Sequence, residues 1–106
     1  MDSPWQKAID FTLKYEGGYD NSPLDKGGET FRGISRKNWA DWAGWAMIDD
    51  LKIAEPETFE KTAMANETLT ASVIAFYRNN FWDKVHGDEF PGKIAVALFD
   101  MAVNSG

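Results

Sequence analysis

The sequence contains no cysteine and a single histidine, His86, among its 106 residues. Without thiols the chain has neither a disulfide framework nor a thiolate metal site. One histidine also argues against a zinc site built from histidines and against a Ser-His catalytic pair. If acid–base chemistry takes place in this protein, carboxylates must carry it, and we expect neither a metal nor a cofactor.

Basic residues and long apolar runs are also scarce. Lys and Arg number 11 against 17 Asp and Glu, which gives a net charge of −6. This charge argues against binding to nucleic acid or to an anionic membrane surface. No apolar run is long enough to cross a bilayer, so we expect no direct membrane insertion. The start, MDSPWQKAID, lacks the basic and then apolar pattern of a signal peptide, so we expect synthesis in the cytoplasm.

Aromatic residues, in contrast, are plentiful. They make up 14% of the chain and include five Trp, in a composition otherwise typical of one globular domain with a modest core. Such a share indicates either an aromatic core or a surface that binds sugars or peptides. Trp39 and Trp42 recur at helical spacing and are expected in the core, whereas Trp45 is out of phase and is expected to be exposed.

The hydrophobic pattern predicts a mainly α-helical protein with four to five helices and a small β element after the first helix. The first helix should begin at Pro4, capped by Ser3, and end at Glu16 before two glycines. Residues 17–30 have the composition of a loop, and residues 30–35 read as a short extended piece. Further helices are predicted from the cap Ser35 to about Ala46, over residues 56–65 and 71–82, and from Pro91 onward, with residues 47–56 as a connection.

Glu16 stands out chemically on the first helix. It lies on the apolar stripe, four residues after Thr12 and three after Leu13. The negative end of the helix dipole and burial would both raise the pKa of this carboxyl, as a general acid requires. The two glycines after it would let a bulky substrate approach. A glutamate at a helix end is more often a solvated surface residue, and the spacing alone leaves both interpretations open.

Two residues of the following loop could complete a site with Glu16. Asp25 lies in a polar stretch, where its carboxylate should remain ionised. One carboxyl with a raised pKa and one ordinary carboxylate across a cleft form the arrangement that glycoside hydrolysis uses. The hydroxyl of Thr30, next to Glu29, would position a water molecule opposite the acid.

Three segments of the chain resemble one protein family. The stretch YEGGYDNSPLDKGGETFRGIS, Tyr15 to Ser35, closely resembles the N-terminal signature of the glycoside hydrolase family 108 muramidases. The segments FYRNNFWDKV and FPGKIAVALFDMAVNSG resemble later parts of that family in the same order. These phage and bacterial enzymes degrade peptidoglycan and have also been described as secretion activators. The resemblance implies a lysozyme-like fold with Glu16 as the catalytic residue. The order of the residues also resembles phage-type lysozymes, which places Asp25 and Thr30 opposite Glu16.

Four further residues are candidates for substrate binding: Tyr19, Glu29, Asp100 and Asn104. Tyr19 would either stack on a sugar ring or pin the loop. Asp100 and Asn104 lie four residues apart on the last helix, where they would hold a sugar or hydrogen-bond Glu16. The alternative for this pair is a network of buried polar groups at a helix end.

The resemblance implies hydrolysis of the β-1,4 glycosidic bond of N-acetylmuramic acid in peptidoglycan. It also implies a bacteriolytic, endolysin-like protein of a bacterium or phage-infected host, which a separate holin-type membrane partner releases to the cell wall. The family usually continues beyond FDMAVNSG, so we expect residues 1–106 to be a lysozyme-like muramidase domain that lacks a C-terminal peptidoglycan-binding region. A naturally frayed terminus is the alternative. The alternative function is a non-catalytic wall-binding module or a regulatory fragment of the same fold.

Overall fold

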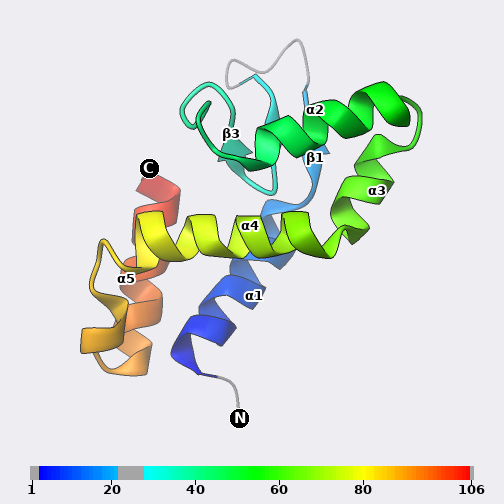
Figure 1. Cartoon of the computed structure of the whole chain (residues 1–106). Helices are drawn as coiled ribbons and strands as arrows, with labels where there is room; N and C mark the ends of the chain where they lie inside the picture. Colours follow the sequence, from blue (N-terminus) through cyan, green and yellow to red (C-terminus); the bar gives the residue numbers. More distant parts are fainter. Residues whose placement is uncertain (1–2, 22–27, 106) are drawn as a thin grey trace. The chain divides into compact units, whose positions relative to one another are not determined.

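The computed structural model of the chain describes residues 3–21 and 28–105 (Figure 1). These residues contain five α-helices and three two-residue strands. They form two compact units. The first unit comprises the chain up to Tyr15 together with the chain from Ile74 onward, and the second unit comprises Glu16–Val73. No helix in this part of the chain combines the length and the apolar character that crossing a lipid bilayer requires.

Helix α1 (Pro4–Glu16) begins and ends where the sequence predicted. The hydroxyl of Ser3 accepts a 3.1 Å hydrogen bond from the backbone N–H of Gln6, which caps the first turn. The helix ends where Gly17 adopts a φ of +76°, a left-handed conformation that a residue without a Cβ accepts readily. The buried face of α1 consists of Ala8, Ile9 and Thr12.

The second unit contains a small antiparallel sheet with the strand order β1 (Tyr19–Asp20), β2 (Thr30–Phe31) and β3 (Ile34–Ser35). In the central strand, Thr30 pairs with Asp20 on one side and with Ser35 on the other. The extended piece predicted over residues 30–35 is therefore two strands of a hairpin. The loop predicted from residue 17 onward contains the remaining strand of the sheet, β1.

The hairpin turns at Arg32 and Gly33, which both have positive φ angles of 47° and 84°. Phe31 and Ile34 form a cross-strand pair and are buried. Since side chains alternate along a strand, Thr30 lies on the other face of the hairpin, away from this apolar pair.

The second helix is displaced from its predicted position. Helix α2 spans Gly44–Ala54, so the predicted connection is mostly helical and residues 36–43 are not. Ser35 caps only a turn, because its hydroxyl accepts a 3.3 Å hydrogen bond from the Asn38 N–H. The first residue of α2 has to be glycine, since the Trp42 ring lies 2.3 Å from the position of a Cβ on Gly44.

Trp45 is buried, so the prediction that it is exposed was wrong. Its side chain is 2% exposed, and its indole N–H donates a 3.0 Å hydrogen bond to the carbonyl of Trp39. It was out of phase with a helix over residues 36–46 that does not form. The other buried apolar residues of the second unit are Phe31, Ile34, Ile48, Ala63, Leu69 and Val73.

The remaining helices match the predictions apart from their ends. They are α3 (Phe59–Ala65), α4 (Glu67–Tyr77) and α5 (Gly92–Ser105). Helix α4 begins earlier than predicted because Asn66 caps it, with a side-chain oxygen that accepts a 2.8 Å hydrogen bond from the Leu69 N–H. Residues Arg78–Trp82, predicted as the end of this helix, are π-helical.

An aromatic cluster forms the core of the first unit. The ring of Trp5 lies 5.4 Å from that of Trp82 and 5.5 Å from that of Phe99. Trp82 is 1% exposed, and its indole N–H donates a 2.9 Å hydrogen bond to Asp88. Trp45 and Trp82 thus support the core interpretation of the aromatic composition.

Candidate functional site

Glu16 is the last residue of α1 and its side chain is partly exposed. Gly17 and Gly18 connect it directly to β1. Apart from Gly17 itself and its two chain neighbours, no described residue has an atom within 4 Å of the place that a Cβ on Gly17 would occupy. None of the described residues therefore fills the space on the Gly17 side of Glu16, as the approach of a bulky substrate requires.

Thr30 belongs to the same unit as Glu16 and is half-buried. The end of α1 leads through two glycines into β1, and β2 carries Thr30 next to β1. This connectivity has the predicted order of an acid at a helix end followed by a threonine in an extended segment. The predicted ionised carboxylate, Asp25, lies outside the described residues.

Glu29 is the centre of a charged network in the second unit. Its Oε2 accepts a 2.6 Å hydrogen bond from the Tyr19 hydroxyl and a further one from the ammonium of Lys52. Its Oε1 accepts a 3.0 Å hydrogen bond from Arg36, which also donates two 2.7 Å hydrogen bonds to the carboxylate of Asp49. These five residues are called the Glu29 network below.

The contacts shift the pKa values of the Glu29 network. Burial raises the pKa of Glu29, but the hydrogen bonds from Lys52, Tyr19 and Arg36 outweigh it and lower the pKa below its usual value. The hydrogen bond from Arg36 lowers the pKa of Asp49. Burial and the contact with Glu29 raise the pKa of Tyr19. Burial alone would lower the pKa of Lys52, but the contacts with Glu29 and Tyr19 raise it. At neutral pH the network therefore holds two negative and two positive charges.

Aromatic rings pack around the cations of the network. The Lys52 ammonium lies 5.3 Å from the centre of the Tyr19 ring and 5.8 Å from that of Phe59. The Arg36 guanidinium lies 5.2 Å from the ring centre of Trp45. These contacts anchor the charged side chains to the buried part of the unit.

Sequence reasoning named Tyr19 and Glu29 but missed the other three members of the network. A local signal for two of them is the i,i+3 spacing of Asp49 and Lys52 on α2, whose charged atoms lie 4.0 Å apart. Arg36 has no such signal, because it follows β3 directly and its position depends on the hairpin. Among the described residues, no three acidic or histidine side chains gather as a metal site would require.

Asp100 and Asn104 lie on α5 in the first unit, and both side chains are exposed. Their exposure excludes the alternative of a buried polar network at the helix end. Their role in holding a sugar stays a prediction.

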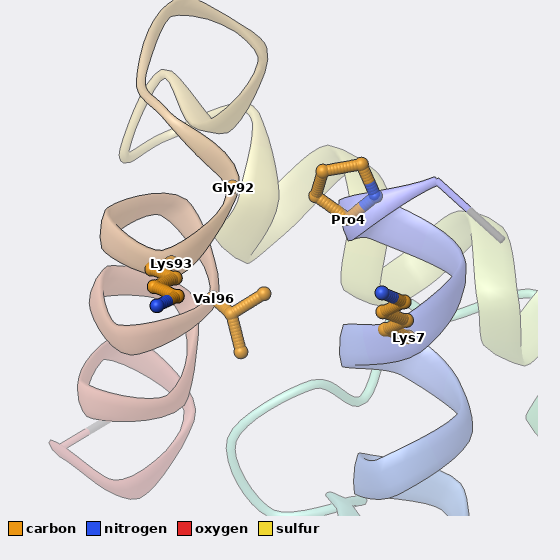
Figure 2. Close-up of a pocket in the computed structure, with 5 residues that line it drawn as sticks. All are labelled: Pro4, Lys7, Gly92, Lys93 and Val96. Atoms are coloured by element: carbon orange, nitrogen blue, oxygen red, sulfur yellow. The ribbon is translucent and has the colours of Figure 1, made fainter.

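The first unit also contains a groove between α1 and α5 (Figure 2). Figure 2 shows Lys7 on α1 and Lys93 on α5, with Val96 between them. The groove holds a cavity of about 550 Å³ that is lined by Pro4, Lys7, Gly92, Lys93 and Val96. A neighbouring cavity of about 320 Å³ shares Lys93 and Val96 with the first cavity and reaches Asp100.

Comparisons with known proteins agree with this architecture. Residues 9–106 match the family model described as glycosyl hydrolase 108. The solved structure of Brucella abortus SagA is similar, with a TM-score of 0.57 and 32% sequence identity over 96% of this chain. The chain covers 51% of that structure, so it spans about half of its length. None of the curated proteins matches the chain at a significant level. The mainly α, lysozyme-like fold predicted from the sequence is confirmed.

Proposed function

We propose that this chain, which belongs to the glycosyl hydrolase 108 family, is a muramidase. It would cleave the β-1,4 glycosidic bond of N-acetylmuramic acid in peptidoglycan. The observation that carries this proposal is the position of Glu16, which ends α1 beside a space at Gly17 that no described residue fills and lies within the matched residues 9–106. A carboxyl at the edge of an open space can reach the oxygen of a glycosidic bond.

In the proposed reaction Glu16 is the general acid. It gives its proton to the glycosidic oxygen as the bond between that oxygen and the anomeric carbon breaks. Positive charge develops on the sugar ring, and a water molecule adds to the anomeric carbon and loses a proton to a carboxylate. Thr30 would position this water, and Asp25 would stabilise the cationic sugar or accept the proton.

The remaining roles follow from the same proposal. Tyr19, Asp100 and Asn104 would contact the glycan strand, which is the partner of the protein. The net charge of −6 argues against nucleic acid as the substrate. We further propose an endolysin-like protein that is made in the cytoplasm and released to the wall by a separate holin-type membrane partner.

A second candidate function is a module that binds the cell wall without cutting it. The observation that favours it is the groove of the first unit, where Lys7 and Lys93 flank apolar walls. Two ammonium groups beside apolar surface suit an anionic wall polymer or the carboxylates of the stem peptides. In this alternative the groove holds the wall and Glu16 has no chemical role.

The experiment that tests the proposal identifies the products. Purified protein is incubated with peptidoglycan, the new reducing ends are reduced with borohydride, and the fragments are analysed by mass spectrometry. A muramidase leaves reduced N-acetylmuramic acid at every new end. Reduced N-acetylglucosamine would contradict the bond that we propose. Binding to the wall without any new reducing end would support the binding module instead.

A further inference from the structure

We propose that Glu29 is a positioning residue that holds the central strand β2 so that the adjacent Thr30 keeps its orientation. In this role Glu29 does not bind sugar itself. The inference rests on the proposed function, in which Thr30 acts on the water or on the developing cation. It differs from the role that the sequence suggested for Glu29, which was contact with substrate.

The first argument is that both carboxylate oxygens of Glu29 already have donors. Oε2 accepts from Tyr19 and Lys52, and Oε1 accepts from Arg36. The side chain of Glu29 is only 12% exposed. Two of the donors are charged, and hydrogen bonds to charged groups are the stronger ones. A sugar hydroxyl would have to displace one of these donors to bind here.

The second argument is that the three donors come from three different places in the unit. Tyr19 belongs to β1, Arg36 follows β3 and Lys52 belongs to α2. The backbone carbonyl of Glu29 also accepts a 2.9 Å hydrogen bond from the N–H of Arg36. Arg36 is itself fixed by two hydrogen bonds to Asp49. The side chain and the backbone of Glu29 therefore connect both edges of the sheet to a helix.

The third argument concerns the strands, which have two residues each. Strands this short make few backbone hydrogen bonds, so pairing alone gives the sheet little stability. The side-chain and backbone hydrogen bonds of Glu29 add stability to this sheet. Because Thr30 is the next residue along the chain, fixing Glu29 also fixes the backbone from which the Thr30 hydroxyl projects.

The kinetic test uses Glu29→Gln, which keeps the size of the side chain and removes its charge. A positioning role predicts that kcat for peptidoglycan hydrolysis falls roughly 10- to 100-fold, because small misplacements of a reacting group have effects of this size. KM should stay within about twofold of the wild-type value, since Glu29 itself makes no contact with the substrate. A rise in KM with unchanged kcat would show that Glu29 binds substrate, and would overturn the inference.

A double-mutant cycle tests whether Glu29 acts through Thr30. In a Thr30→Ala background, Glu29→Gln should cause little further loss, because the group that it positions is already absent. If the fold-losses in kcat of the two single variants multiply in the double variant, the two residues act independently, which would contradict the inference. Asp88→Asn is the matched control, because Asp88 also accepts two hydrogen bonds, from Trp82 at 2.9 Å and from Arg78 at 2.6 Å, but lies in the first unit. This variant should keep the wild-type kcat.

Amide hydrogen exchange gives a readout that does not depend on activity. The N–H groups of Arg32 and Arg36 donate to the carbonyls of Gly18 and Glu29, at 2.8 and 2.9 Å, on either side of Thr30. Glu29→Gln should speed their exchange about tenfold or more, and Asp88→Asn should not. Unchanged exchange in Glu29→Gln would overturn the inference even if the wild type hydrolyses peptidoglycan. If the wild type does not hydrolyse it, the proposed function fails, and faster exchange still shows that Glu29 holds β2.

Discussion

The hydroxyl of Tyr19 in β1 donates a 2.6 Å hydrogen bond to Oε2 of Glu29, just before β2. The Tyr19 ring packs edge-on against Phe59 of α3, with ring centres 5.0 Å apart. Tyr19 therefore joins the sheet to a helix of the same unit. This geometry agrees with the loop-pinning role that the sequence left open, and stacking on a sugar stays a prediction.

Tyr19→Phe should lower the free energy of unfolding by about 1–2 kcal/mol, because it keeps the ring and removes a partly buried hydrogen bond to a charged acceptor. Urea denaturation measures this change. Tyr15→Phe is the control, because the Tyr15 side chain is 77% exposed and its change should stay within about 0.5 kcal/mol. Equal stability of the two variants would show that the hydroxyl of Tyr19 contributes nothing to the fold.

The Glu29 network predicts a loss of stability in acid. The pKa values of Glu29 and Asp49 are lowered in the folded protein, so their stabilisation is present above the unfolded values of about 4. This stabilisation is lost as the pH falls through the lowered folded values. The free energy of unfolding of the wild type should therefore decrease from about pH 5 to about pH 3. The free energy of unfolding of Glu29→Gln should decrease less steeply over the same range. Equal slopes in urea titrations at these pH values would contradict the prediction.

The Glu29 network also predicts a loss of stability at alkaline pH. The pKa values of Tyr19 and Lys52 are raised in the folded protein. Their contribution to stability is therefore present below the unfolded pKa values of about 10, and it is lost as the pH rises through the higher folded values.

Gly87→Ala should destabilise the aromatic core of the first unit. A Cβ at Gly87 would lie 2.3 Å from the ring of Trp82, which is buried and cannot move away easily. Overpacking of this kind costs about 1–3 kcal/mol. Gly92→Ala is the control, because its Cβ would lie 3.0 Å from the Cγ of Pro4, at the exposed start of α1. Thermal unfolding of both variants measures the difference, and a Gly87→Ala protein as stable as the control would contradict the packing.

The elements that could be predicted from the sequence are those with local signals. Helix α1 has its cap at Ser3 and its stop at Gly17, and both signals act within one turn of the helix. Helix α2 could not be placed in this way. Trp39 and Trp42 imitate a helical stripe, but the indole of Trp42 donates to the carbonyl of Ser72, thirty residues away. Such contacts depend on the folded chain, and a periodic pattern contains no information about them.

In the candidate site, too, features with local signals could be predicted, and features that depend on long-range contacts could not. The place of Glu16 at the end of α1, next to glycine, could be predicted because its signals are local, and its role as the acid stays a prediction. The partners of Glu29 could not be predicted, since Lys52 is 23 residues away and meets it only when α2 packs beside the sheet. Sequence reasoning therefore named Glu29 and its donor Tyr19, missed the donors Arg36 and Lys52, and assigned Glu29 to the substrate.

The central claim is that Glu16 is the general acid, and the release of reducing ends from peptidoglycan by wild type and Glu16→Gln tests it most directly. An amide at this position cannot donate the proton, so the rate should fall by roughly 100-fold or more while the unfolding transition stays close to that of the wild type. A folded Glu16→Gln protein that cleaves peptidoglycan at a rate near that of the wild type would contradict the account.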